Sequence, residues 1–270
     1  MPISPSARVH PTAIVSPEAE LGDGVEVGAM AIIEGPVRIG PRCVLRPRSM
    51  ICGPLTMGEG NVVFSGAVLG ERPQHLRFTD APTGVWIGDY NIFRENVTVH
   101  GGTTYPWSTR IGHHNLFMAG SHVAHDCQIG NRCILANGSL VAGHCVLEDN
   151  VYLSGNSAVH QFVRIGRLAL LSGCSGTSKD IPPFIVQHGL DNVSGINVVG
   201  MRRAGMSPAQ INAVRQAFRV IFRQGLSLPA AVDRLESDLG HIDVVAEMIA
   251  FLRKSRRGVC PMRDQRRRAA

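Results

Sequence analysis

The chain has 270 residues, of which 44% are hydrophobic and 5% aromatic, as is ordinary for a soluble protein with a core of small aliphatic side chains. No basic segment precedes an early apolar run and no apolar stretch could cross a bilayer, so we expect a cytoplasmic protein without stable membrane insertion. The net charge of +6 comes from residues 253–270, which hold eight basic residues against one aspartate, so we expect a solvated basic tail and no nucleic-acid partner.

An apolar residue recurs at every sixth position over residues 3–69, 87–99 and 111–171. A helix needs apolar residues every three to four positions and a half-buried strand needs them every two, so a period of six fits neither. It is typical of the hexapeptide repeats of a parallel β-helix. Three hexads make one 18-residue coil, so residues 18 apart should stack at about 4.8 Å, the spacing of neighbouring strands.

Two features of the repeat describe the corners and the interior of the predicted prism. Nine of the apolar residues are followed directly by glycine, which we expect where the chain turns tightly. The residue two places before each apolar residue is usually small, as expected if both positions point inward. Four of the seven cysteines occupy this small position and no CxxC pair is present, so we expect buried thiols rather than disulfides or a zinc site. These are Cys43, Cys127, Cys133 and Cys145.

Two interruptions of the repeat predict inserted loops near residues 70–86 and 100–110, and loops on a rigid scaffold often carry function. After the repeat fades, Ser207 followed by Pro208 predicts the start of a helix. The predicted organisation is a β-helix over residues 1–190, a small helical domain over 191–258 with further helices near 227–239 and 242–255, and a basic tail over 259–270. A solvated end and a role in binding an acidic partner or an anionic membrane surface both remain open for the tail.

Histidines gather along one edge of the predicted prism. His144 follows His125 by one coil plus one residue, and His160 follows it by two coils minus one, so the three lie on successive coils. None occupies an inward position. The pattern indicates a groove lined by imidazoles, one acting as a general base near neutral pH and oriented by Asp126. Chance alignment of surface histidines is the alternative. Gly143 and Gln161 follow His125 by 18 and 36 residues, so we expect them to stack with it in one column along this edge.

Several motifs closely resemble the UDP-N-acetylglucosamine acyltransferases of lipid A biosynthesis. They are His122-Val123-Ala124-His125-Asp126-Cys127, Gly130-Asn131-Arg132-Cys133-Ile134-Leu135-Ala136-Asn137, Ala158-Val159-His160-Gln161-Phe162, Gly173-Cys174-Ser175-Gly176 and Pro182-Pro183. The resemblance spans nearly the whole chain. It implies a left-handed β-helix, an exception to the usual right-handed crossover, and a homotrimer with active sites between subunits. It also implies transfer of a 3-hydroxyacyl group from acyl carrier protein to the 3-hydroxyl of UDP-N-acetylglucosamine, the first step of lipid A biosynthesis, without cofactor or metal.

The same resemblance implies roles for single residues. His125, with Asp126, would deprotonate the sugar hydroxyl, which would attack the thioester directly. The Gly143 backbone N–H would stabilise the oxyanion. Gly173 would leave the acyl groove open at its far end. The other residues implied to bind substrates are Gln74, Arg77, His122, His144, His160, Gln161, Asn197 and Arg203.

The chain departs from the family pattern around the expected acceptor. His75 stands where the family usually has an aspartate, and Gly101 where it usually has an arginine. Val199 and Ala204 stand where a glutamate and an arginine are common. These changes keep open a divergent enzyme that N-acylates an amino-sugar nucleotide, and a non-catalytic paralogue that binds acyl carrier protein or sugar nucleotide.

A zinc enzyme like the γ-type carbonic anhydrases, which share the predicted prism, is a further alternative. A zinc site needs imidazoles that converge to within about 2.1 Å of one ion. His144 and His160 lie on different coils by the stacking rule, so the sequence disfavours this alternative and predicts no metal site.

Overall fold

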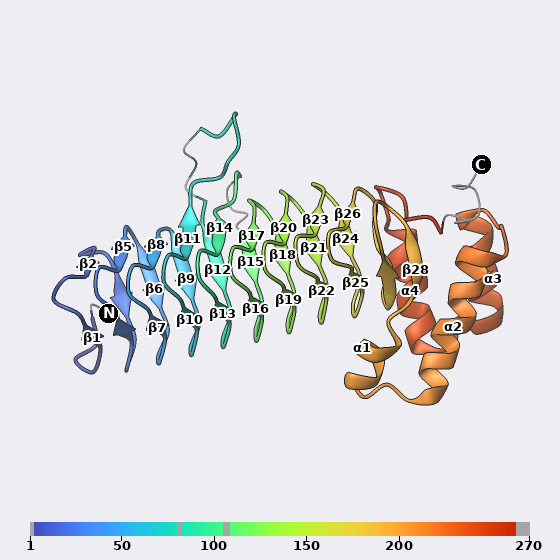
Figure 1. Cartoon of the computed structure of the whole chain (residues 1–270), viewed down its shortest axis with the longest axis horizontal. Coiled ribbons are helices and arrows are strands. Elements are labelled where there is room, and N and C mark those ends of the chain that lie inside the picture. The colour runs from blue at the N-terminus through green and yellow to red at the C-terminus, as the bar shows by residue number, and fades with distance from the viewer. Residues whose placement is uncertain (1–2, 80, 82, 105–108, 263–270) are drawn as a thin grey trace.

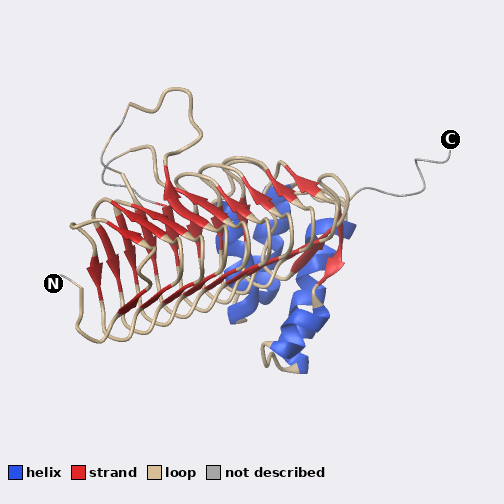
Figure 2. Ribbon diagram, turned by 60° about the vertical axis from the view of Figure 1, so that its left-hand side comes forward, coloured by secondary structure: helices blue, strands red, loops and turns tan. Residues whose placement is uncertain are grey.

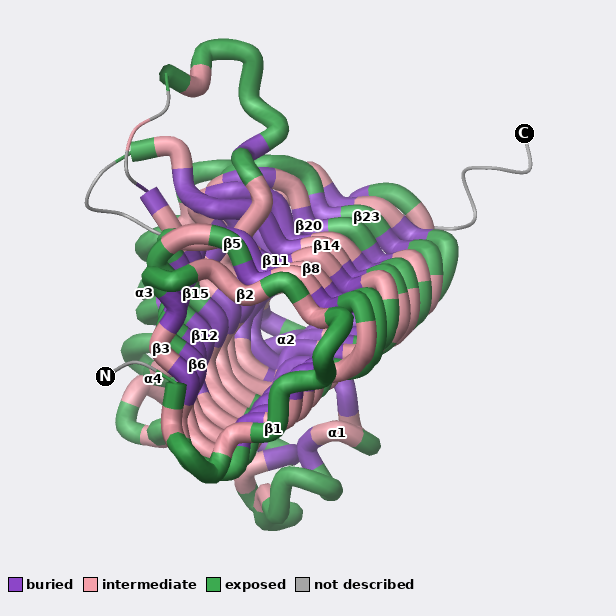
Figure 3. The backbone as a smooth tube through the Cα atoms, turned by 90° about the vertical axis from the view of Figure 1, so that its left-hand side faces the viewer, coloured by how far each residue is buried: buried purple, intermediate pink, exposed green. Residues whose placement is uncertain are grey.

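The computed structural model describes residues 3–79, 81, 83–104 and 109–262. Short strands form a long prism, and the helices pack at its C-terminal end (Figure 1). Three sheets, here named A, B and C, form the three faces of the prism (Figure 2). Seen along its length, the prism encloses a single buried interior (Figure 3).

Sheet A consists of β1 (Arg8–Val9), β4 (Glu26–Val27), β7 (Val44–Leu45), β10 (Val62–Val63), β13 (Ile92–Phe93), β16 (Leu116–Phe117), β19 (Ile134–Leu135), β22 (Tyr152–Leu153), β25 (Leu170–Leu171), β27 (Ile185–Gln187) and β28 (Val193–Ile196). Sheet B consists of β2 (Ile14–Val15), β5 (Ile32–Glu34), β8 (Met50–Cys52), β11 (Val68–Glu71), β14 (Thr98–His100), β17 (His122–Val123), β20 (Leu140–Val141), β23 (Ala158–Val159) and β26 (Gly176–Thr177). Sheet C consists of β3 (Glu20–Leu21), β6 (Val37–Ile39), β9 (Leu55–Met57), β12 (Val85–Ile87), β15 (Thr109–Ile111), β18 (Gln128–Ile129), β21 (Val146–Leu147) and β24 (Arg164–Ile165).

Strand pairing follows the hexapeptide repeat. Val123 pairs in parallel with Val141, 18 residues later, and the spacing widens where a segment is inserted, as between Leu69 and Val99. The apolar residues of the repeat are all buried from Leu21 to Leu171. The predicted mainly β protein with a parallel β-helix is therefore confirmed. The four cysteines expected to point inward are buried, and all seven cysteines, which lie within the described residues, are free.

Most glycines of the repeat have a different role from the one expected. Left-handed backbone occurs three residues after the apolar residue, for example at Asn96 (φ 56°), Asp126 (59°) and His144 (61°). Gly112, which follows an apolar residue directly, does not have a positive φ; a Cβ there would lie 2.6 Å from the carbonyl oxygen of Gly130 in the next coil. Of the nine glycines that follow an apolar residue, Gly70 alone has a positive φ (93°). For the other eight the predicted turning role is wrong, because glycine is required there for close approach of neighbouring segments.

Four helices follow within the described residues: α1 (Val198–Arg203), α2 (Pro208–Arg223), α3 (Leu228–Leu239) and α4 (Asp243–Arg253). The predicted start at Pro208 is confirmed, because Ser207 and Gln210 form a capping box. Helices α3 and α4 match the two expected near 227–239 and 242–255. Strand β28 and helix α1 were not anticipated. Each described helix is too short or too polar to span a bilayer.

Side chains attach α4 to the end of the prism. Arg167 donates to both carboxylate oxygens of Glu247, at 2.9 and 2.7 Å. The chain then returns to the prism, where Val259 forms a β-bridge with Asp180 and Cys260 is fully buried. The start of the predicted basic tail is thus packed, whereas residues 263–270 lie outside the described residues, as do residues 105–108 of the second predicted loop.

Candidate active site

The candidate site occupies the corner at which the chain passes from sheet B to sheet C. His125 and Asp126 lie between β17 and β18, and His144 lies one coil later between β20 and β21. Both inserted segments leave the prism at this same corner, between β11 and β12 and between β14 and β15. They project from the upper edge of the prism in Figure 1. The fold therefore brings the two insertions to the edge that carries the histidines.

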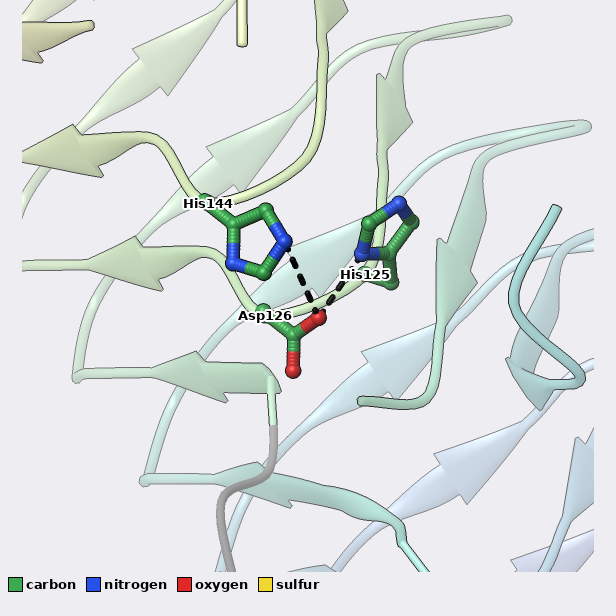
Figure 4. A group of neighbouring side chains, drawn as sticks. All are labelled: His125, Asp126 and His144. Carbon is green, nitrogen blue, oxygen red and sulfur yellow. Dashed lines mark hydrogen bonds and ion pairs between the residues drawn. The ribbon is translucent and has the colours of Figure 1, made fainter. Parts of the chain in front are cut away.

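His125 and Asp126 are hydrogen-bonded to each other within one chain. The Nδ1 of His125 lies 2.7 Å from Oδ2 of Asp126, and the Nε2 of His144 lies 3.7 Å from the same oxygen (Figure 4). Because an ionised carboxylate only accepts hydrogen bonds, the proton of neutral His125 is assigned to Nδ1 and its Nε2 is left as an acceptor. This is the tautomer that a general base requires.

The second insertion closes onto the Asp126 carboxylate. The backbone N–H of Thr103 donates to Oδ1 at 2.9 Å and its hydroxyl donates to Oδ2 at 2.7 Å. Burial opposes the charged form of Asp126, but the hydrogen bonds from His125 and Thr103 outweigh it and hold the pKa of Asp126 below its ordinary value. The carboxylate is therefore charged at neutral pH.

Gly143 leaves room for the His125 ring. A Cβ at position 143 would lie 2.5 Å from Cε1 and 2.7 Å from Nε2 of His125. The ring of His75, from the first insertion, packs edge-on against His125 with 5.3 Å between centroids. With these neighbours His125 is only 8% exposed, so it is enclosed by the insertion rather than displayed on an open groove.

Two more histidines of the corner, His122 and His144, are partly buried. His144 stacks on Phe162, with 4.6 Å between ring centroids, and burial lowers its pKa. His122 lies 2.7 Å through Nδ1 from the Thr98 hydroxyl, and burial lowers its pKa to about 4. Both are therefore neutral hydrogen-bonding groups near pH 7.

Sequence reasoning missed His100, Thr103 and Phe162. His100 is buried beside His122, and its Nδ1 has no hydrogen-bond partner among the described residues. The 18-residue rule could not find His100 or Thr103, because the insertion lengthens that coil. Phe162 lies 18 residues after His144, so the same rule that placed the histidines could have found it.

The remaining predicted residues lie on other coils or on the first insertion, where Gln74 and Arg77 flank His75. His160 is exposed and contacts Arg257, with 3.2 Å between Nδ1 and Nη2. Gln161 is one coil beyond Gly143, and Gln74 and Arg77 are exposed on the first insertion. Gly173 lies at the next corner, between sheets A and B.

Asn197 and Arg203 belong to the other side of the prism. Arg203 lines a groove of about 300 Å³ together with Arg132 and Tyr152, on the outer side of sheet A. Asn197 borders this groove but caps helix α1, accepting from the Gly200 N–H at 2.9 Å. One chain therefore unites His125, Asp126, Gly143 and His144, and separates them from Asn197 and Arg203, two of the residues expected to bind substrates.

The chain matches known proteins over nearly all of its length. Residues 180–260 match the family model of UDP-N-acetylglucosamine O-acyltransferase domain 2, and residues 108–143 match the bacterial transferase hexapeptide model. The acyl-[acyl-carrier-protein]–UDP-N-acetylglucosamine O-acyltransferase of Anaeromyxobacter sp. (strain Fw109-5) is 46% identical, covering 93% of this chain and 98% of the relative. The enzyme of the same name from Halorhodospira halophila is 43% identical, covering 93% of this chain and 98% of the relative.

Solved structures agree with these relatives. The UDP-N-acetylglucosamine acyltransferase of Bacteroides fragilis 9343 is 36% identical with a TM-score of 0.89, covering 93% of this chain and 99% of that one. The enzyme of Francisella novicida is 30% identical with a TM-score of 0.85, covering 97% and 94%. The expected left-handed coiling of the hexapeptide prism is confirmed. The chain belongs to the UDP-N-acetylglucosamine O-acyltransferase family.

Proposed function

We propose that this chain transfers a 3-hydroxyacyl group from acyl carrier protein to the 3-hydroxyl of UDP-N-acetylglucosamine, the first step of lipid A biosynthesis. Its relatives are named as O-acyltransferases of this substrate pair, which favours O-acylation over the alternatives of N-acylation and of a non-catalytic paralogue. The observation that carries the proposal is the enclosed pair of His125 and Asp126, whose bond leaves the Nε2 of His125 as an acceptor.

The reaction follows from this arrangement. As the 3-hydroxyl oxygen attacks the thioester carbonyl carbon, its proton passes to Nε2 of His125 and a C–O bond forms. The charged Asp126 stabilises the imidazolium that results. When the C–S bond breaks, the same proton passes to the departing thiolate, so no cofactor or metal is required. The Gly143 N–H donates to no acceptor within the described part of the chain, which supports its role as a donor to the oxyanion.

A homotrimer with sites between subunits is part of the proposal, because two of the three faces are apolar outside. The outward residues of sheet A include Val44, Val62, Ile92, Leu116 and Ile134, and those of sheet B include Ile14, Ile32, Met50, Val68 and Leu140. Those of sheet C are mostly polar, among them Glu20, Arg38, Thr56, Arg110 and Gln128. Apolar rows of this length suit subunit contacts.

A closed ring of three subunits would also explain why the predicted site residues lie in two separate parts of one chain. If sheet A of one chain packs on sheet B of the next, two adjacent faces of a triangular prism are used and a ring of three closes. The groove with Arg203 in one chain then lies along the face that borders His125 of its neighbour.

The test is acyl transfer by the purified protein. A set of 3-hydroxyacyl carrier proteins of different chain lengths is offered with UDP-N-acetylglucosamine, and products are identified by mass. We expect a 3-O-acyl product, a loss of about 10²- to 10⁴-fold in kcat for His125→Ala and for Asp126→Asn, and no loss for the exposed control His10→Ala. A folded protein without product at any chain length would refute the proposal.

A further inference from the structure

The groups that the proposed reaction uses, His125 and Asp126, also form a potential metal-ligand set with His144. One side-chain atom from each of His125, Asp126 and His144 lies within 4.8 Å of those from the other two. The zinc alternative was disfavoured because His144 and His160 are separated along the prism. In the structure the third converging group is Asp126 and not His160, so two imidazoles and one carboxylate lie close together (Figure 4).

The chemistry of this group suits a divalent transition-metal ion. Two histidines and one carboxylate, with the fourth position open to water, form a known kind of zinc site. Ligands about 2.1 Å from a tetrahedral ion are about 3.4 Å from one another. Oδ2 of Asp126 is 2.7 Å from His125 Nδ1 and 3.7 Å from His144 Nε2, so small side-chain movements would accommodate an ion. The side chain of His144 is 33% exposed, which gives an ion access.

We propose that His125, Asp126 and His144 bind a zinc-type divalent cation, and that the bound ion blocks the reaction. An ion on Nδ1 of His125 takes the position of the Nδ1 proton. The neutral ring must then carry its proton on Nε2, which can no longer accept a proton from the sugar hydroxyl. The ion also takes the Asp126 carboxylate that would stabilise the imidazolium. Binding is independent of the proposed function, whereas inhibition rests on it.

Binding is tested by titrating Zn²⁺ into the chelator-treated protein by calorimetry, and by titrating Co²⁺ while the visible absorption is recorded. We expect one ion per chain and a cobalt spectrum of low coordination number. His144→Ala and Asp126→Asn should weaken binding at least tenfold. His160→Ala, at the same corner one coil later, is the matched control and should bind as the original chain does. Circular dichroism verifies that each variant is folded.

Inhibition is tested with the acyl-transfer assay in the presence of Zn²⁺, followed by chelator. Loss of transfer that the chelator restores, at the concentrations that saturate binding, supports the proposal. No saturable binding, or binding that His144→Ala and Asp126→Asn leave unchanged, overturns the site. Saturable binding of Zn²⁺ with undiminished acyl transfer refutes the proposed inhibition. Absence of transfer before any metal is added refutes the proposed function instead, and the calorimetric result still decides the site.

Discussion

Replacement of Gly143 by alanine tests whether the position of the His125 ring determines activity. The added Cβ would lie 2.5 Å from Cε1 of His125, whereas ordinary contacts between carbon atoms begin near about 3.5 Å. The φ of Gly143 lies outside the left-handed region, so alanine brings no backbone strain there. The ring would have to move by about 1 Å, which would stretch its 2.7 Å bond to Asp126 beyond hydrogen-bonding range.

A displacement of this size is expected to lower kcat/KM about 100-fold, equivalent to about 3 kcal/mol of transition-state stabilisation. The backbone N–H of residue 143 is retained in the variant, so the loss would report the displaced base rather than a missing oxyanion donor. The assay is acyl transfer with kcat and KM determined separately, and thermal unfolding measures folding. Gly195→Ala is the matched control, because nothing lies within 4 Å of its Cβ position. Full activity in Gly143→Ala would refute the reasoning.

Three further predictions concern stability and assembly. Ser207→Ala removes the hydroxyl of the α2 capping box, so urea unfolding should show a loss of about 1 kcal/mol in stability. The acyl-transfer assay should show an unchanged kcat. His122 has a folded pKa of about 4 against about 6.5 when unfolded, so the unfolded chain binds the proton first. Its contribution to stability should be complete above pH 6.5 and fall by up to about 3 kcal/mol as the pH drops to 4, with a smaller fall in His122→Gln. Leu140→Glu, on the apolar outer side of sheet B, should reduce the mass measured by light scattering, and Thr56→Glu on sheet C should not; a Leu140→Glu protein that remains trimeric would contradict the proposed interface.

The sequence predicted the prism in detail because one physical rule governs it. Each hexad must deliver one apolar residue to a narrow interior, so the period of six also fixes which strands pair. Val123 and Val141 pair as the 18-residue coil requires, and Cys145, also an inward residue, is buried. The start of α2 was predictable for another local reason, since Ser207 and Pro208 are the residues that begin helices.

The rule that residues 18 apart stack predicted fewer contacts at the candidate site, because insertions change the length of a coil. The 18-residue rule aligns His144 with Asp126, 18 residues earlier, as observed, but it could not align His100 with His122 or bring Thr103 to the Asp126 carboxylate. The enclosure of His125 was unpredictable for the same reason. It depends on where His75 comes to rest, and the hexads contain no information on the path of that segment.

The geometry of the corners explains why a β-helix can hold a reactive group without a cleft. The third residue after most of the buried apolar residues has a positive φ, and along one corner these residues stack side chain on side chain, 18 residues apart where no segment is inserted. Asp126, His144 and Phe162 form one such column, whereas Tyr90 and His114, stacked at 5.2 Å, belong to a column at a different corner. Stacking alone therefore makes aromatic and imidazole pairs at more than one edge. Only the corner between sheets B and C also receives the two inserted segments, which supply Thr103 to the carboxylate and His75 to the base. The prism provides fixed spacing between the residues, and the insertions provide the enclosure that makes one column a candidate active site.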